Sequence, residues 1–147
     1  MPLDASLTGK TYPPSPPYEV GREKIREFAD AIGAPEAAYR DVAAAKELGH
    51  PDVIAPPTFP VIFSGTINDT LIADTALGLD FSRVVHGDQR FAYVRPVRAG
   101  DRLVCRATIE DIQSRVGNDF ITTRGEISTE DGEPVLTLWC RLVVRGA

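Results

Sequence analysis

Long apolar runs are missing from this sequence. No segment approaches the roughly 18 to 20 consecutive apolar residues that a membrane-spanning helix needs. The N-terminal stretch MPLDASLTGKTYPPSPPYEV also has no apolar centre of the kind found in secretory signals. We therefore expect no membrane association and a cytoplasmic location.

Basic side chains are in deficit as well. The chain has 16 Lys and Arg against 21 Asp and Glu, which gives a formal net charge of -5. The basic residues are scattered along the sequence and form no cluster. Because a nucleic-acid surface needs a dense group of positive charges for the phosphates, we expect no nucleic acid as a partner.

Cysteine and histidine are scarce, with two of each. Cys105 and Cys140 are too few for a disulfide framework and lie in apolar, strand-like runs, so we expect two buried free thiols. His50 and His86 are far apart and have no surrounding Cys or Asp spacing that suits a metal ion. The sequence therefore predicts no metal site.

The chain has the composition of one globular domain. It has 147 residues, of which 43% are hydrophobic and 25% charged. A chain of this length buries about two-thirds of its unfolded surface on folding. We expect a single domain over residues 1–147.

Helical patterns dominate the first half. Residues 20–33 repeat apolar side chains at helical spacing and end at Gly33, a residue suited to a helix C-terminus. A shorter helix is predicted from Asp41 as N-cap to Gly49. A third helix is predicted to begin with Thr58 as N-cap and to run through an apolar stretch to Asp74. Its broad apolar surface predicts that it is the buried helix.

The second half has the period of two that is typical of strands. The runs 83–97, 101–115, 119–129 and 133–145 are separated by short segments that hold Gly beside Asp or Asn, which predicts consecutive antiparallel strands. An antiparallel sheet wrapped around one long helix is an α+β hotdog fold. Such a sheet has strand edges to protect, so we expect pairing with a second chain.

Several segments resemble a known family. VGREKIREFA, IAPPTF and RVVHGDQRFAYVRPVRAGD are similar to the MaoC-like (R)-specific enoyl hydratase and 3-hydroxyacyl dehydratase family of hotdog proteins. The likeness runs from about Leu3 to Arg145 and is strongest to the actinobacterial branch with the MaoC-like dehydratase N-terminal domain. That branch includes the non-catalytic-type subunits of the mycobacterial (3R)-hydroxyacyl-ACP dehydratase of fatty acid biosynthesis. The resemblance implies an acyl-CoA or acyl-ACP thioester ligand and no metal or redox cofactor.

This chain departs from the family's catalytic loop. In catalytic members the loop after the first helix carries Gly-Asp-x-Asn-Pro-x-His, whose Asp and His act as acid and base. A Gly amide at the start of the central helix donates a hydrogen bond to the thioester oxygen. On this chain the loop positions hold Gly33, Ala34, Glu36, Ala37 and Tyr39.

The glycine with the donating amide corresponds to Pro57, which has no amide hydrogen. Acid, base and oxyanion donor are thus replaced together. Tyr39 can serve as an acid, but its ordinary pKa near 10 makes it a poor base, and an aromatic cap on the pocket is the favoured interpretation. By position in the family, the predicted substrate-binding residues are Tyr39, Pro57, Thr58, Phe59 and Phe63.

His86 and Asp88 are the remaining histidine and carboxylate that can work together. Residues two apart in a strand point to the same face, so the sequence predicts a shared face for this pair. The pair is a candidate for substitute acid and base, or for binding a phosphopantetheine arm. A polar pair at a strand start or a dimer interface is the structural alternative, and Gly87 between them can permit a bulge.

Four functions compete on this sequence. The first is a subunit of a (3R)-3-hydroxyacyl-ACP or -CoA dehydratase, a lyase, that holds the acyl chain in a heterodimer with a catalytic hotdog subunit. The second is an active homodimeric hydratase that uses His86 and Asp88. The third is a non-enzymatic acyl-binding or regulatory module. The fourth is a hotdog thioesterase, for which no Asp or Glu nucleophile is evident on the central helix.

Overall fold

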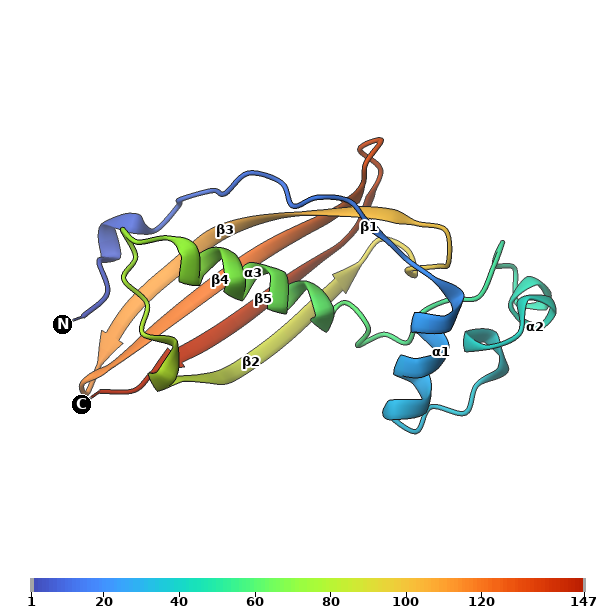
Figure 1. The fold of residues 1–147 in the computed structure, drawn as a ribbon, viewed down its shortest axis with the longest axis horizontal. Helices are drawn as coiled ribbons and strands as arrows, with labels where there is room; N and C mark the ends of the chain where they lie inside the picture. The colour runs from blue at the N-terminus through green and yellow to red at the C-terminus, as the bar shows by residue number, and fades with distance from the viewer. Residues whose placement is uncertain (1, 147) are drawn as a thin grey trace.

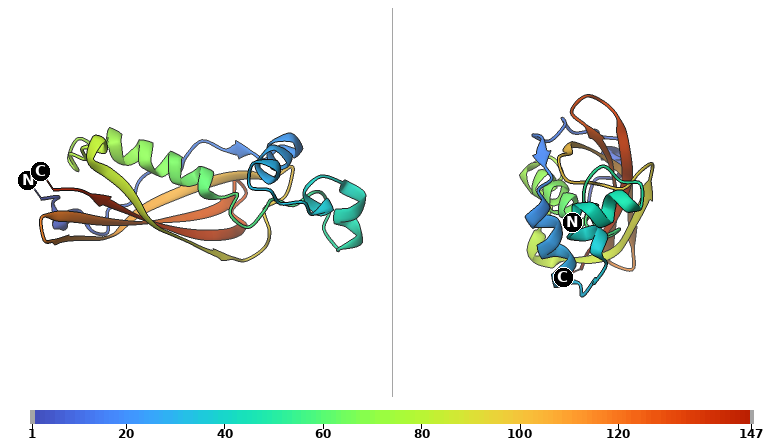
Figure 2. Two further views of the ribbon diagram at one scale, coloured as in Figure 1. Left: turned by 90° about the horizontal axis from the view of Figure 1, so that it is seen from below. Right: turned by 90° about the vertical axis from the view of Figure 1, so that its right-hand side faces the viewer.

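A computed structural model describes residues 2–146 and shows one antiparallel sheet that curls around a long helix, α3 (Figure 1). The helices are α1 (Arg22–Ala31), α2 (Val42–Glu47) and α3 (Val61–Ala73), with 3-10 turns η1 (Ala5–Leu7), η2 (Ala37–Tyr39) and η3 (Phe81–Arg83). The strands are β1 (Tyr18–Glu19), β2 (Val84–Tyr93), β3 (Arg102–Arg115), β4 (Asn118–Thr129) and β5 (Pro134–Val144). The α+β hotdog fold predicted from the sequence is confirmed, and Figure 2 shows α1 and α2 beyond one end of the sheet.

The strand order differs from the predicted run of consecutive strands. The order is β1-β3-β4-β5-β2, so β2 pairs with β5 rather than with β3, its neighbour in sequence. The segment after β2 bonds instead to residues before α3: the Ala55 amide donates to the Val97 carbonyl at 2.8 Å, and the Ala99 amide to the Val53 carbonyl at 3.0 Å. These bonds guide the chain across the end of the sheet from one edge to the other.

Local signals place α1 and α2 as predicted. Gly33 follows α1 with a φ of 69°, a left-handed conformation that costs glycine little. The Asp41 carboxylate accepts a hydrogen bond from the Ala43 amide at 2.9 Å and so caps α2. The end of α1 and the start of α2 are therefore fixed by residues that the sequence pattern identifies.

The predicted start of α3 was wrong. The helix begins at Val61 with Pro60 at the N-cap position, and the Thr58 side chain does not cap it. Before it, the Phe59 amide donates to the Pro56 carbonyl at 2.9 Å and the Val61 amide to the Thr58 carbonyl at 3.0 Å. A Thr58 cap would accept from the amide of residue 60 or 61, but Pro60 has no amide hydrogen and the Val61 amide donates to the Thr58 carbonyl instead.

One face of α3 packs tightly on the sheet. It buries Phe63, Ile67 and Leu71, and β4 passes beneath it at Gly125. A Cβ at Gly125 would lie 2.9 Å from Ile67 Cδ1 and 3.2 Å from the Sγ of Cys105. The missing side chain at this position therefore sets how closely α3 approaches the sheet. Cys105 and Cys140 are both buried free thiols, as predicted.

Gly125→Ala is expected to lower the free energy of unfolding by about 1–3 kcal/mol, because the added methyl overpacks a filled core. Gly65→Ala is the matched control, since a Cβ at Gly65 on α3 meets no atom within 4 Å. The control should be neutral or stabilising by up to about 1 kcal/mol through helix propensity. Urea denaturation of both variants checks this, and equal effects would contradict the close approach.

The two edges of the sheet differ. An N-terminal strap, residues 9–15, runs along β3, where the amides of Gly9, Tyr12 and Ser15 donate to carbonyls of the strand at 2.7–2.9 Å. β1 covers the next part of the same edge. At the other edge, β2 pairs with β5 on one side, and no strand within residues 2–146 pairs with its other side. One edge is therefore closed, and the other is open along the length of β2.

The strap is fastened to the end of α3 through Asp74. Its Oδ2 accepts from the Tyr12 hydroxyl at 2.6 Å and from Lys10 Nζ at 2.5 Å. The hydrogen bonds from Lys10 and Tyr12 lower the pKa of Asp74 to about 2. The ionised carboxylate thus holds the strap against the helix.

A carboxyl group whose pKa is lower in the folded protein stabilises the fold fully at pH values above its pKa in the unfolded chain. This stabilisation is lost as the pH falls through its pKa in the folded protein. The contribution of Asp74 should be complete above about pH 4 and disappear towards pH 2. Asp74→Asn should cost about 1–2 kcal/mol near neutral pH and flatten the loss of stability in acid. Thermal unfolding against pH measures this, with Asp69→Asn on the exposed side of α3 as the control. The same acid dependence in both variants would refute the role of Asp74.

Candidate functional site

A pocket of about 270 Å³ lies between η2, the turns before α3 and the segment after β2. Two of the predicted substrate-binding residues, Tyr39 and Pro57, line it together. The full lining is Tyr39, Ile54, Ala55, Pro57, Tyr93, Val94, Arg95 and Pro96. Mostly apolar walls with a few polar groups are typical of a site for a small organic ligand.

Two polar side chains of this pocket, Tyr93 and Arg95, already have partners within the protein. The Tyr93 hydroxyl donates to the Pro57 carbonyl at 2.6 Å. Arg95 donates to both carboxylate oxygens of Asp101 at 2.9 Å and to Glu133 at 2.7 Å. Tyr93, the last residue of β2, and Arg95, just after it, were not predicted as lining residues, because the strand pattern did not predict the path of the chain at the end of β2.

Neither tyrosine of the pocket can act as a base at neutral pH. Burial, and then the charge of Glu36, raise the pKa of Tyr39 above its usual value. Burial, with a smaller contribution from Tyr39, raises the pKa of Tyr93 strongly. Both phenols therefore remain protonated and can only donate, or accept through a neutral oxygen.

The family's catalytic positions have no acid–base chemistry in this pocket. Ala34 replaces the Asp, and its amide donates to the Ala29 carbonyl at 2.9 Å as part of the end of α1. Glu36, at the Asn position, is exposed and precedes η2. Pro57 faces the pocket without an amide hydrogen. The pocket can enclose an apolar group but has no carboxylate and imidazole pair to move its protons.

The other predicted substrate-binding residues lie outside the pocket lining. Phe59 and Phe63 are 0% and 2% exposed, and their rings pack edge-to-face against Phe28 and Tyr18. Thr58 is exposed in the turn before α3. The two phenylalanines are thus core residues in this structure, and a ligand role for these three positions stays a prediction.

The structure separates His86 from Asp88, so the predicted shared face was wrong. A β-bulge at Gly87 shifts the register, and His86 lies opposite Leu142 while Asp88 lies opposite Arg141. Cross-strand partners share a face, and Leu142 is buried whereas Arg141 is exposed. The bulge inserts an extra residue and thereby turns the two side chains to opposite faces.

His86 belongs instead to a polar cluster that links β2 to α3, the Ser64–Gln89–His86 array. Gln89 Oε1 lies 3.0 Å from the Ser64 hydroxyl and 3.1 Å from His86 Nε2. Gln89 Nε2 donates to the Trp139 carbonyl at 3.1 Å. Sequence reasoning missed Ser64 and Gln89, and the one available signal was Gly87, which permits the bulge.

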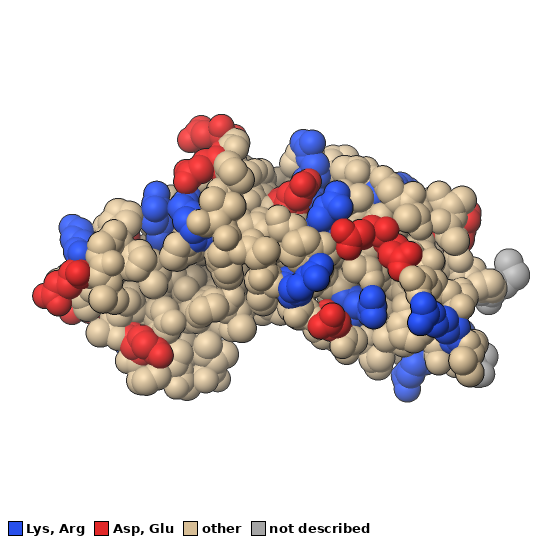
Figure 3. Space-filling view, turned by 180° about the vertical axis from the view of Figure 1, so that it is seen from behind, with Lys and Arg blue, Asp and Glu red and all other residues tan. Residues whose placement is uncertain are grey.

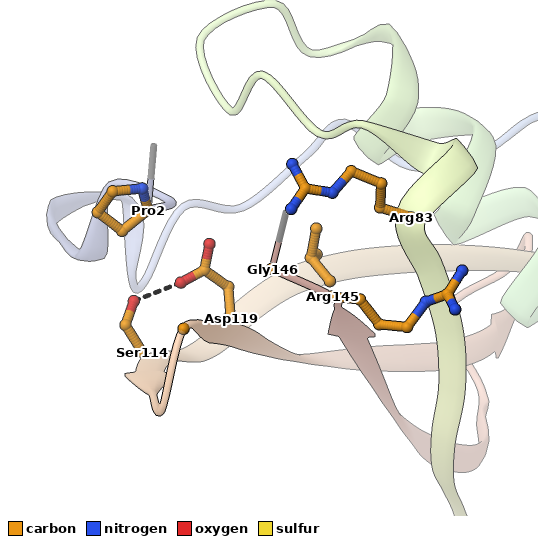
Figure 4. Close-up of a pocket in the computed structure, with 8 residues that line it drawn as sticks. Pro2, Arg83, Ser114, Asp119, Arg145 and Gly146 are labelled. Carbon is orange, nitrogen blue, oxygen red and sulfur yellow. Dashed lines mark hydrogen bonds between the residues drawn. The ribbon is translucent and has the colours of Figure 1, made fainter.

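A second pocket, of about 340 Å³, lies at the opposite end of the sheet (Figure 4). Asp119 in this pocket accepts hydrogen bonds from the Ser114 hydroxyl and from the Leu3 amide, the latter at 3.0 Å. Arg83 extends over the pocket, whereas the side chain of Arg145 points away from Asp119. None of the predicted site residues lines this pocket.

The outer face of the sheet, opposite α3, carries acidic and basic side chains intermixed (Figure 3). Arg124 pairs with Glu110 at 3.3 Å, and the Arg90 guanidinium lies 4.1 Å from the centre of the Trp139 ring. The visible face therefore has no dense positive patch for a phosphate backbone. In the described part of the chain, no helix could cross a membrane and no three His, Cys, Asp or Glu side chains gather around a metal position.

Comparison with known proteins identifies the fold family. A family model described as "FAS1-like, dehydratase domain region" matches residues 6–138. The chain belongs to this family of MaoC-like hotdog dehydratase domains. The MaoC-like resemblance stated from the sequence is thereby confirmed.

The relatives of this MaoC-like chain are actinobacterial proteins and dehydratases. It is 60% identical to a UPF0336 protein of Streptomyces coelicolor, over 100% of this chain and 98% of that protein. It is 33% identical to a chain of the HadBC (3R-hydroxyacyl-ACP dehydratase) complex of Mycobacterium tuberculosis, with a TM-score of 0.83 and coverage of 97% and 99%. A solved MaoC-like dehydratase is 31% identical with a TM-score of 0.87, and the match covers 97% of this chain but 43% of that protein.

The bond between Tyr93 and Pro57 can be tested by stability. Tyr93→Phe keeps the ring and leaves the Pro57 carbonyl without its donor, so the free energy of unfolding should fall by about 0.5–1.5 kcal/mol. Tyr39→Phe is the control, because its pKa shift arises from burial and a nearby charge rather than from a hydrogen bond. The control should change by less than about 0.5 kcal/mol in urea denaturation. An unchanged free energy of unfolding in Tyr93→Phe would show that the bond between Tyr93 and Pro57 does not hold the pocket wall.

Proposed function

We propose that this chain, as one MaoC-like hotdog domain over residues 1–147, is the acyl-holding subunit of a (3R)-3-hydroxyacyl thioester dehydratase. The supporting observation is the apolar pocket lined by Tyr39 and Pro57, which occupy the family's base and oxyanion-donor positions, while Ala34 occupies the position of the acid. The reaction is reversible loss of water from an acyl-ACP or acyl-CoA thioester. A partner chain supplies the Asp and His that perform it.

The surface offered to the partner is the open edge of β2 and the exposed face of α3. Val61, Gly65, Asn68 and Ile72 follow one another at helical spacing on that face. Val61 and Ile72 are 39% and 43% exposed, which is unusual for apolar side chains of the central helix. The Asn68 Oδ1 is buried yet has no hydrogen-bond partner within residues 2–146. A second hotdog chain can cover the apolar stripe that includes Val61 and Ile72.

The relationship to a chain of the HadBC complex supports a heteromeric assembly. The alternative of an active homodimer based on His86 and Asp88 loses support, because the bulge turns these side chains to opposite faces. A non-enzymatic acyl-binding module and a thioesterase remain distinguishable by assay. The acyl-binding module predicts that an acyl thioester binds without turnover in any complex. The thioesterase predicts release of the free acid.

The test is hydration of a short enoyl-CoA by the purified chain, by a hotdog partner that carries the Asp and His loop, and by the two co-expressed. Turnover of the chain alone should be at least about 100-fold below that of the complex, because acid and base are missing together. Ile72→Glu places a charge on the exposed face of α3 and should abolish both complex formation and activity while the melting temperature of the chain stays the same. Full turnover by the chain alone, lost in Tyr39→Phe or Glu36→Gln, would overturn the proposal.

A further inference from the structure

The Ser64–Gln89–His86 array fixes which nitrogen of His86 carries the proton. The Trp139 carbonyl can only accept, so the group of Gln89 that lies 3.1 Å from it must be the amide nitrogen. The opposite atom, Oε1, is then an acceptor that faces both Ser64 and His86. The serine hydroxyl donates one bond to it, and His86 Nε2–H donates the other.

A neutral imidazole with its proton on Nε2 has its free lone pair on Nδ1. The His86 side chain is exposed, and Nδ1 makes no hydrogen bond to any residue from 2 to 146. The array therefore leaves one proton acceptor free at the open edge of β2. Asp88 does not take part, because its side chain lies on the opposite face of the strand and its carboxylate accepts from the backbone amide of Gln89 at 2.9 Å.

The bulge at Gly87 brings this arrangement about. A Cβ at Gly87 would lie 3.1 Å from Val143 Cγ2 and 3.3 Å from the Arg141 carbonyl. With glycine there, the extra residue fits, and His86 and Gln89 reach the same face of β2. Ser64, in the first turns of α3, then completes the array from above the strand.

His86 is far along β2 from the pocket of its own chain. Tyr93, the pocket residue at the end of β2, is seven residues away, or roughly 23 Å of extended strand. Two chains that pair along β2 about a two-fold or pseudo-two-fold axis run antiparallel. If Val84–Tyr93 overlaps fully with the same strand of the partner, His86 lies opposite position 91 of the partner. That position is two residues from position 93, which in this chain lines the pocket.

We propose that His86, held as its Nε2–H tautomer by Gln89 and Ser64, directs Nδ1 into the partner's active site and accepts a hydrogen bond from the reacting water. The inference rests on the proposed function. In the hydration direction this is the water whose oxygen adds to C3 of the enoyl thioester. In dehydration it is the water that leaves. No bond to His86 forms, and proton transfer to and from carbon remains with the partner's acid and base.

The experiment uses the co-expressed complex and an enoyl-CoA substrate. His86→Gln removes the acceptor at the Nδ1 position and should lower kcat roughly 10- to 100-fold with little change in KM. His86→Asn keeps an oxygen acceptor near the Nδ1 position and should recover part of that loss. Asp88→Asn, on the opposite face, is the matched control and should leave kcat unchanged within about twofold.

The positioning residues have a separate spectroscopic readout. Nitrogen-detected NMR of the labelled, isolated chain should show that the neutral form of the His86 imidazole carries its proton on Nε2. Gln89→Ala should mix the two tautomers and lower kcat of the complex, whereas a merely structural role would leave the tautomer unaffected. This measurement does not depend on partner or substrate.

The outcomes separate the two proposals. A wild-type complex without hydratase activity overturns the proposed function, and the role of His86 falls with it. An active complex in which His86→Gln matches wild type overturns the role of His86 alone. A rise in KM with unchanged kcat also overturns it, because the residue would then bind the carrier arm rather than the reacting water.

Discussion

The structure depends on the close packing of α3 against the sheet at Gly125. Ile67 of α3 occupies the space that a side chain at Gly125 would fill, so the helix lies close enough for Phe63 and Leu71 to be buried beside it. Each of these side chains contributes about 1.5–3 kcal/mol when it is removed from water. The sheet covers one side of α3, while the apolar Val61 and Ile72 stay exposed on a side that also holds the polar Asn68. Exposed apolar side chains in a row on a central helix are typical of a surface that another element covers.

The same one-sided packing explains why the two sheet edges differ. The strap of residues 9–15 closes the β3 edge and is fastened to the end of α3 by Asp74. The β2 edge has no such cover within residues 2–146, and it borders the exposed side of the helix. An open edge beside an exposed apolar helix face forms one continuous surface. A partner that only added a strand to β2 would leave the exposed face of α3 uncovered. A second hotdog domain can cover both the β2 edge and that helix face.

Periodicity in the sequence predicted most of the elements but not how they are connected. The helix ends at Gly33 and Asp41, and the buried side of β3 and β5, follow from side-chain spacing and local caps. The pairing of β2 with β5 does not, because it depends on bonds between residues 53–55 and 97–99, which are distant in sequence. The bulge at Gly87 was also out of reach. A glycine permits a bulge, but the bulge itself and the close approach of Val143 and Arg141 to Gly87 depend on the pairing of β2 with β5.

These two unpredicted features determine how the polar chemistry is distributed. The end of β2 and the segment after it bring Tyr93 and Arg95 to the pocket, where they bond to Pro57, Asp101 and Glu133. These bonds tie the pocket wall to the rest of the fold, and neither side chain acts as a base there. The bulge places an imidazole with a free nitrogen at the opposite end of β2. Only antiparallel pairing with a second chain brings one chain's imidazole close to the other chain's pocket. Under the proposed function, the two groups that this chain offers, the pocket and the imidazole, would act only where a second chain pairs with β2.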